Sequence, residues 1–316
     1  MVLAGDDARP WNDPAPLSER PAAMQRRTFL QCSAGASAAL LSIPLTRAFG
    51  AEVKGERMAY GLVTYQWAKD WDLPTLLANC AKAEVPGVEL RTTHAHGVEP
   101  SLNERQREDV KRRFADSGVT LVGLGSNERF DHVDPAALKK AIETTKDFIR
   151  LSHDVGGTGV KVKPDTFHKD VPREKTIEQI GRALNEVGEY GAGFGQQVRL
   201  EVHGQCGDLP TIKSILDVAD DPNVAICWNS NAQDLQGEGL EHNLNLVRDR
   251  FGATLHVRQW DAPGYPWQEL VNLLVATDYD GWVMLEDSNL PKDPVAALAR
   301  QQKQFRAMVE EGQKSL

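Results

Sequence analysis

The sequence predicts an α/β protein with the (β/α)8 architecture of a TIM barrel, and three observations indicate this fold. Short runs rich in β-branched residues alternate eight times with amphipathic helical segments between residues 58 and 311. This stretch has roughly 250 residues, which is typical of one barrel. The turn after the first run, residues 61–71, lacks the Gly-rich phosphate loop expected of an open doubly wound sheet.

The predicted strands are short and mostly apolar, as expected for strands covered on both faces by other elements. In chain order they are residues 58–65, 87–91, 120–123, 159–163, 198–203, 224–229, 254–258 and 281–286. Several helices begin at Asp-Pro, Val-Pro or Asp-Leu-Pro signals, which suit the first helical turn. The predicted helices are residues 73–83, 103–117, 135–154, 172–191, 209–218, 240–250, 267–277 and 294–311.

The segment before the barrel predicts export. Arg26 and Arg27 precede a Phe-Leu pair and a small-residue apolar run, and Ala48, Phe49 and Gly50 form a cleavage box. The apolar run is too short and too rich in small residues to span a bilayer. We therefore predict an N-terminal extension and twin-arginine signal peptide in residues 1–50 and one barrel domain in residues 51–316. The Tat translocase would export the protein to the periplasm or the cell exterior.

Charge limits the class of partner. The chain has a net charge of −9, and removal of residues 1–50, with five basic and four acidic groups, leaves −10. Such a surface repels nucleic acid and anionic lipid, and the sequence has no basic run that would override this. We predict a small-molecule partner, no nucleic acid and no stable membrane span, and the sequence leaves a homo-oligomer open.

Chemically capable residues recur at the ends of the predicted strands, where a TIM barrel builds its active site. Glu201 and Glu286 lie within apolar runs that are expected to be buried. A buried carboxylate without a partner is costly in free energy, so a purely structural role is a poor explanation of these two residues. Structural pairing of Glu89 with Arg91 and solvation of Lys161 and Lys163 at the rim are equally good explanations of those residues. The full set is Glu89, Arg91, His94, His96, Lys161, Lys163, Glu201, His203, Asn229, His256, Arg258 and Glu286.

Four of these residues come from consecutive strands and converge in a barrel. Glu201, Asn229, His256 and Glu286 combine two carboxylates, an amide and an imidazole. An oxygen-rich set with one histidine suits Mn²⁺, Mg²⁺, Co²⁺ or Zn²⁺ in an open site. A bound cation polarises a substrate oxygen, while a carboxylate beside it removes a proton from the adjacent carbon.

The motifs "GVELR", "LEVHG", "CWNSN", "LHVRQW" and "GWVMLED" together resemble the xylose isomerase-like TIM-barrel superfamily, which includes sugar phosphate isomerases and epimerases and AP endonuclease family 2. The resemblance implies that strands five to eight donate metal ligands, normally Glu, Asp, His and Glu. Here they are Glu201, Asn229, His256 and Glu286, so the second ligand lacks its charge. It also implies that Glu201 and Glu286 form the acid/base pair of the ketose epimerases.

The same resemblance argues against DNA repair, because Ala232 and Gln259 stand where the nucleic-acid branch and many relatives have His and Asp. We predict an exported, metal-dependent sugar isomerase or epimerase. Its substrate-binding residues would be Glu89, Lys163, His203 and Arg258. Two alternatives remain open: a lyase or hydrolase of oxidised (3-keto) glycosides, and a non-catalytic sugar-binding barrel, which the lost charge at Asn229 favours.

Overall fold

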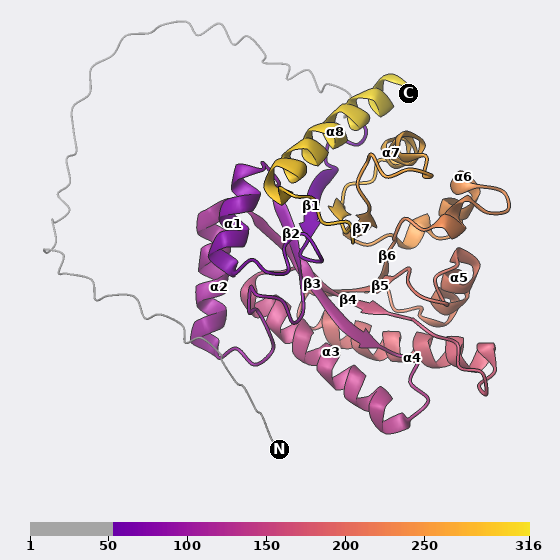
Figure 1. Cartoon of the computed structure of the whole chain (residues 1–316). Coiled ribbons are helices and arrows are strands. Elements are labelled where there is room, and N and C mark those ends of the chain that lie inside the picture. Colours follow the sequence, from indigo (N-terminus) through magenta and orange to yellow (C-terminus); the bar gives the residue numbers. More distant parts are fainter. Residues whose placement is uncertain (1–52) are drawn as a thin grey trace, which may run out of the picture. The chain divides into compact units, whose positions relative to one another are not determined.

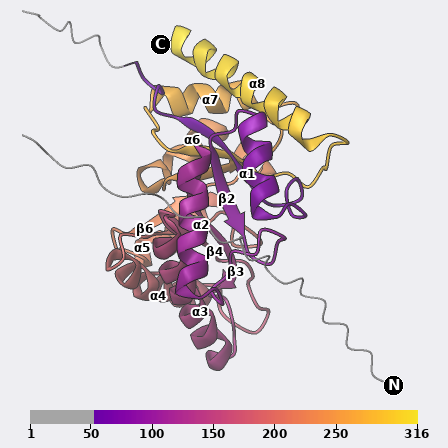
Figure 2. The same cartoon turned by 90° about the vertical axis from the view of Figure 1, so that its left-hand side faces the viewer.

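Eight parallel strands, each followed by a helix, make up residues 53–316, the part of the chain that the computed structural model describes. The predicted signal peptide in residues 1–50 lies outside the described residues. Figure 1 shows the helices arranged in a ring around the strands, and Figure 2 shows the outer layer from the side of α1 and α2. Within residues 53–316, no helix is long and apolar enough to cross a membrane.

The order of the strands in the sheet is β6-β5-β4-β3-β2-β1-β8-β7. The strands are β1 Ala59–Val63, β2 Gly87–Arg91, β3 Thr120–Arg129, β4 Gly159–Lys163, β5 Gln197–Glu201, β6 Val224–Cys227, β7 Thr254–Val257 and β8 Trp282–Leu285. The helices are α1 Leu73–Lys82, α2 Glu104–Ser117, α3 Pro135–Val155, α4 Arg173–Ala192, α5 Leu209–Val218, α6 Leu240–Asn245, α7 Trp267–Ala276 and α8 Pro294–Lys314.

The two ends of this sheet, β6 and β7, meet and close the barrel. The amide of His256 donates to the carbonyl of Trp228 at 2.7 Å, and the amide of Ser230 donates to the carbonyl of His256 at 3.1 Å. These bonds form an isolated parallel bridge between Asn229 and His256. The predicted (β/α)8 barrel is confirmed, and its seam places two of the predicted metal ligands side by side.

Aspartate side chains begin several of the helices that cover the barrel. Asp72, Asp208 and Asp293 each accept a hydrogen bond from a backbone amide in the first turn of α1, α5 and α8. A proline near the start of each helix supplies a backbone angle suited to that turn. These caps fix where each loop from the carboxyl end of a strand turns back, and so they frame the site.

Two elements differ most from the sequence prediction. β3 extends to Arg129, six residues beyond its predicted end, because Gly125 and Arg129 pair with Lys161 and Lys163 of β4. The predicted helix over 240–250 is interrupted after Asn245 and resumes as a short 3-10 turn. There the guanidinium of Arg250 donates to the carbonyls of Ala219, at the end of α5, and Val224, the first residue of β6, a tertiary contact that helical periodicity does not reveal.

Candidate active site

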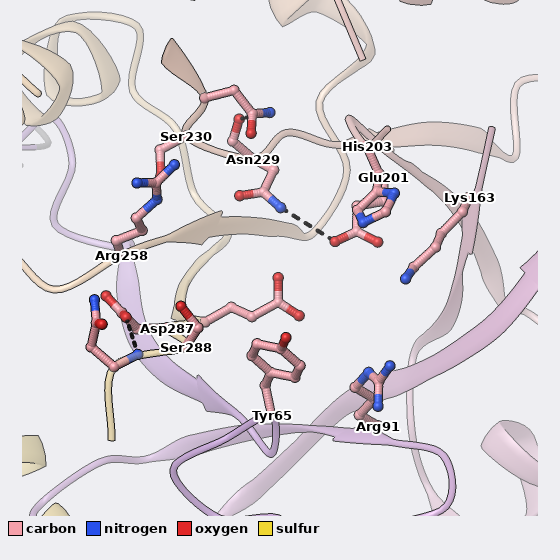
Figure 3. Close-up of a pocket in the computed structure, with 13 residues that line it drawn as sticks. Tyr65, Arg91, Lys163, Glu201, His203, Asn229, Ser230, Arg258, Asp287 and Ser288 are labelled. Carbon is pink, nitrogen blue, oxygen red and sulfur yellow. Dashed lines mark hydrogen bonds between the residues drawn. The ribbon is translucent and has the colours of Figure 1, made fainter. Parts of the chain in front are cut away.

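A cavity of about 440 Å³ opens at the carboxyl ends of the strands (Figure 3). The residues that line it lie at or just after the ends of several strands, because parallel strands of a barrel all end at the same rim. The cavity is lined by six of the eight residues predicted to bind metal or substrate, namely Lys163, Glu201, His203, Asn229, Arg258 and Glu286. Tyr65, which follows β1, and Arg91, the last residue of β2, line the same cavity. The structure thus brings most of the predicted set to one place.

Glu201 and Glu286 line this cavity, and the fully buried His256 contacts both of them. Nδ1 of His256 lies 3.6 Å from Oε1 of Glu201 and 3.2 Å from Oε2 of Glu286. One ligand atom from each residue lies within 4.8 Å of the other two. Donors bound about 2.1 Å from a common zinc ion lie roughly 3 to 3.5 Å apart. These three side chains therefore fit a divalent cation.

Asn229 occupies the fourth predicted ligand position. Its Nδ2 donates to Oε1 of Glu201 at 3.3 Å (Figure 3). The two ends of an amide are distinguished by their hydrogen bonds, and a half-turn exchanges Nδ2 for Oδ1 at this place. The same geometry can therefore offer a cation a neutral oxygen, which holds it less tightly than a carboxylate would.

Lys161, a strand-end candidate to which the sequence analysis assigns no metal or substrate role, is buried and not solvated at the rim, and it contacts both carboxylates. Its Nζ lies 2.7 Å from Oε2 of Glu201 and 4.0 Å from Oε1 of Glu286. The side chains of Lys161 and Glu201 are both 1% exposed, so this ion pair is fully buried. A lysine in the middle of a largely apolar strand requires such a partner, and this requirement was the signal available in "GVKVK".

The charges of this cluster stabilise one another. Burial tends to raise the pKa of Glu201, but Lys161 and His256 outweigh it and hold that pKa well below its ordinary value. The pKa of Glu286 is also lowered, since Lys161 and His256 again outweigh burial. Burial tends to lower the pKa of His256, yet Cys227, Glu89 and Glu286 raise it well above its ordinary value. Both glutamates are therefore held as carboxylates.

Glu89 lies behind His256 and away from the cavity. It is fully buried, and its Oε1 lies 3.3 Å from Nε2 of His256. A side chain at Gly125 would place its Cβ 3.1 Å from the same oxygen, so glycine leaves room for this carboxylate. The predicted substrate-binding role of Glu89 does not agree with this position. Instead, the carboxylate lies against the ring nitrogen of His256 that faces away from Glu201 and Glu286, without a hydrogen bond to it, which is where a carboxylate stands behind a histidine when that histidine holds a cation.

Cationic and aromatic side chains form part of the cavity wall. The guanidinium of Arg91 lies 5.4 Å from the centre of the Tyr65 ring and donates to Oδ1 of Asn127. Among the described residues, no side-chain hydrogen bond or ion pair engages the ammonium of Lys163 or the guanidinium of Arg258, although both residues line the cavity. Their donors are therefore available to the oxygens of a ligand.

Several solved structures share this fold. A 3-keto-D-glucoside 4-epimerase from E. coli superposes with a TM-score of 0.68 at 15% identity, covering 79% of this chain and 99% of its own. An L-ribulose 3-epimerase gives 0.69 at 15% identity, with coverages of 81% and 96%. The IOLI protein, solved with a zinc atom, gives 0.67 at 15% identity, with coverages of 80% and 99%.

The sequence has no significant match among curated proteins. A family model described as a xylose isomerase-like TIM barrel matches residues 77–308, which include every predicted metal ligand. The match covers most of the chain, from α1 to α8. The chain therefore belongs to the xylose isomerase-like TIM barrel family.

Proposed function

We propose that this protein is a metal-dependent sugar isomerase or epimerase that moves a proton on the carbon next to a carbonyl group. The observation that carries the proposal is the cluster of Glu201, His256 and Glu286, whose two carboxylates line a polar cavity. The sugar epimerases among the structural neighbours support the substrate class. The zinc atom of the IOLI protein supports a divalent cation, with Mn²⁺, Mg²⁺, Co²⁺ and Zn²⁺ as candidates.

The roles of the side chains follow from their exposure and contacts. A bound cation would supply polarisation of a sugar carbonyl or hydroxyl oxygen. Glu286 is the more accessible carboxylate, at 14% exposure against 1% for Glu201, so we assign proton removal to Glu286. Glu201, held by Lys161, completes the acid/base pair. Lys163, His203 and Arg258 bind sugar hydroxyls from the cavity wall.

The test is exchange of a carbon-bound hydrogen with solvent. The metal-loaded protein is incubated in D₂O with D-fructose, D-psicose, L-ribulose and a methyl 3-keto-glucoside, and deuterium at carbon is followed by NMR. We expect exchange with at least one of these sugars and a loss of about 10²- to 10⁴-fold in Glu286→Gln. Glu128→Gln, which changes a carboxylate outside the cavity, should exchange as the wild type does.

The 3-keto glucoside is included because an epimerase of such a sugar is a structural neighbour. Release of the aglycone from it would favour the lyase or hydrolase alternative. Binding of a sugar by wild type and Glu286→Gln alike, without exchange in either, would replace the proposal with a sugar-binding barrel.

We also propose that the protein is exported through the twin-arginine route, so that the cation is acquired in the cytoplasm before export. The motif at Arg26 and Arg27 supports this proposal. Lysine at both positions should retain the protein in the cytoplasm, as measured by cell fractionation. Exported protein without stoichiometric metal on elemental analysis would contradict early loading.

A further inference from the structure

Asp165, in the loop after β4, joins two side chains from neighbouring strands. Its Oδ2 accepts a hydrogen bond at 2.6 Å from the guanidinium of Arg129, the last residue of β3. Its Oδ1 lies 2.8 Å from Nδ1 of His203, which follows β5. Burial tends to raise the pKa of Asp165, but these two hydrogen bonds outweigh it and lower that pKa. Both oxygens of an ionised carboxylate are therefore engaged.

The ionised carboxylate determines the tautomer of His203. A carboxylate can only accept hydrogen bonds, so Nδ1 of His203 must carry the hydrogen. In a neutral imidazole the other nitrogen is then a bare acceptor. The His203 side chain is 40% exposed and lines the cavity beside Glu201 and Lys163 (Figure 3). Its Nε2 can thus meet a ligand there.

The backbone maintains this arrangement at a cost. Asp165 has a φ of 68°, the left-handed region that residues other than glycine seldom adopt. Its backbone forms a bridge with Gly204, and its carbonyl accepts from the amide of Cys206 at 3.1 Å. A Cβ at Gly204 would lie 2.5 Å from the Asp165 carbonyl oxygen, so only glycine fits. Conformations of this kind are concentrated at functional sites.

We propose that Asp165 is a positioning residue that holds His203 in its Nδ1–H tautomer, so that Nε2 accepts a hydrogen bond from a hydroxyl group of the bound sugar. Arg129 anchors Asp165 from the other side. The identity of the ligand rests on the proposed sugar chemistry, whereas the tautomer is a property of the free protein. The consequence for specificity is that this position favours a hydroxyl group, which can donate to Nε2, over a carbonyl or ether oxygen, which cannot.

The decisive variant is Asp165→Asn. Asparagine tolerates the left-handed backbone well, so the loop is retained. Arg129 can only donate, which turns Oδ1 of the new amide toward it and Nδ2 toward His203. Nδ1 of His203 must then accept, and its hydrogen moves to Nε2. The substitution therefore inverts the tautomer while leaving the shape of the site unchanged.

The tautomer is measured on protein labelled with ¹⁵N-histidine, by long-range ¹H–¹⁵N correlation spectra above pH 8. The His203 signals are assigned by their absence in His203→Gln. We expect a protonated Nδ1 and a bare Nε2 in the wild type and the reverse in Asp165→Asn. An Nε2–H tautomer in the wild type, or the same tautomer in both proteins, would overturn the proposal.

A kinetic comparison separates positioning from simple support of the loop. Asp131→Asn is the matched control, because Asp131 also lies near Arg129 and accepts from the amide of Thr166, yet it does not line the cavity. With the sugar of the panel that exchanges fastest, Asp165→Asn should lower kcat/KM at least tenfold and Asp131→Asn less than twofold. Equal losses in the two variants would reduce Asp165 to a structural role. If no sugar exchanges, the proposed function fails, and the NMR result still decides the tautomer.

Discussion

Lys161 and Arg199 lie in register on the adjacent strands β4 and β5, and both are 1% exposed, yet their side chains serve opposite ends of the barrel. Arg199 reaches the starts of the strands, where it donates to Val122, Thr158 and Gln197. Lys161 reaches the strand ends and pairs with Glu201. The partners of Arg199 are neutral and give each of its three nitrogens one hydrogen bond, whereas Lys161 belongs to a cluster of charges that faces a cavity.

This difference separates a structural buried cation from a functional one. A guanidinium whose donors are satisfied by carbonyls and hydroxyls closes the base of the barrel and needs no ligand. Three carboxylates gathered around one lysine and one histidine leave negative charge that a further cation can balance. The carboxyl end of the barrel is therefore the end that can do chemistry.

The largest expected effect is on stability. Lys161→Met leaves the buried Glu201 without its partner, so the free energy of unfolding should fall by about 3–5 kcal/mol. Arg199→Met should cost about 1–3 kcal/mol, because Thr158 and Gln197 keep other hydrogen bonds. Urea denaturation of both variants measures the difference. Adding Glu201→Gln to Lys161→Met should recover part of the loss, and equal costs for the two cations would remove the distinction.

The second effect is on the pH dependence of stability, and it concerns His96, whose ring nitrogens both have backbone hydrogen-bond partners. Nε2 of His96 contacts the carbonyl of Arg91 at 2.8 Å, and Nδ1 accepts from the amide of Val98. Burial lowers the pKa of His96 to about 4. In the unfolded chain the histidine has a pKa near 6.5, so as the pH falls it takes up a proton before the folded protein does. The contribution of neutral His96 to the free energy of unfolding is therefore complete above pH 6.5 and is lost as the pH falls to about 4.

The loss should amount to about 3 kcal/mol over that window. Urea denaturation between pH 7 and pH 4 measures it. His96→Gln cannot titrate, so its stability should fall less steeply over the same range. Parallel slopes for the two proteins would show that His96 is not held neutral.

A smaller effect concerns the carboxylate behind His256. Glu89→Gln should weaken zinc binding about 10- to 100-fold, because the histidine loses the carboxylate that orients it. Competition with a coloured chelator measures the affinity, and Glu128→Gln serves as the control. A raised KM with unchanged zinc affinity would instead support the substrate-binding role that the sequence predicts for Glu89.

The smallest effect tests the neutral ligand. Asn229→Asp places a third carboxylate beside Glu201, so zinc affinity should rise about tenfold. The same chelator competition measures it. An unchanged affinity would mean that the side chain at position 229 does not face the cation.

The sequence alone predicts the barrel because hydrophobic periodicity and helix caps are local. Aspartates such as Asp72 and Asp293 form the expected caps, and eight alternations of strand and helix have one closed solution. The placement of Glu201 and Glu286 at one cavity follows from the same logic, since the carboxyl ends of parallel strands share a rim.

Only the tertiary structure decided how deeply each of these side chains is buried and which residues it contacts. Lys161 and Lys163 point to the same side of β4, but one lies beneath the cavity and the other lines it, because two residues of rise carry a side chain from the interior to the rim. On β2, likewise, Arg91 at the end of the strand lines the cavity, whereas Glu89, two residues earlier, is buried against His256. The role that we propose for Asp165 depends on a left-handed turn and on two partners, one at the end of β3 and one in the loop after β5. Such contacts depend on distances across the barrel, which no local pattern records.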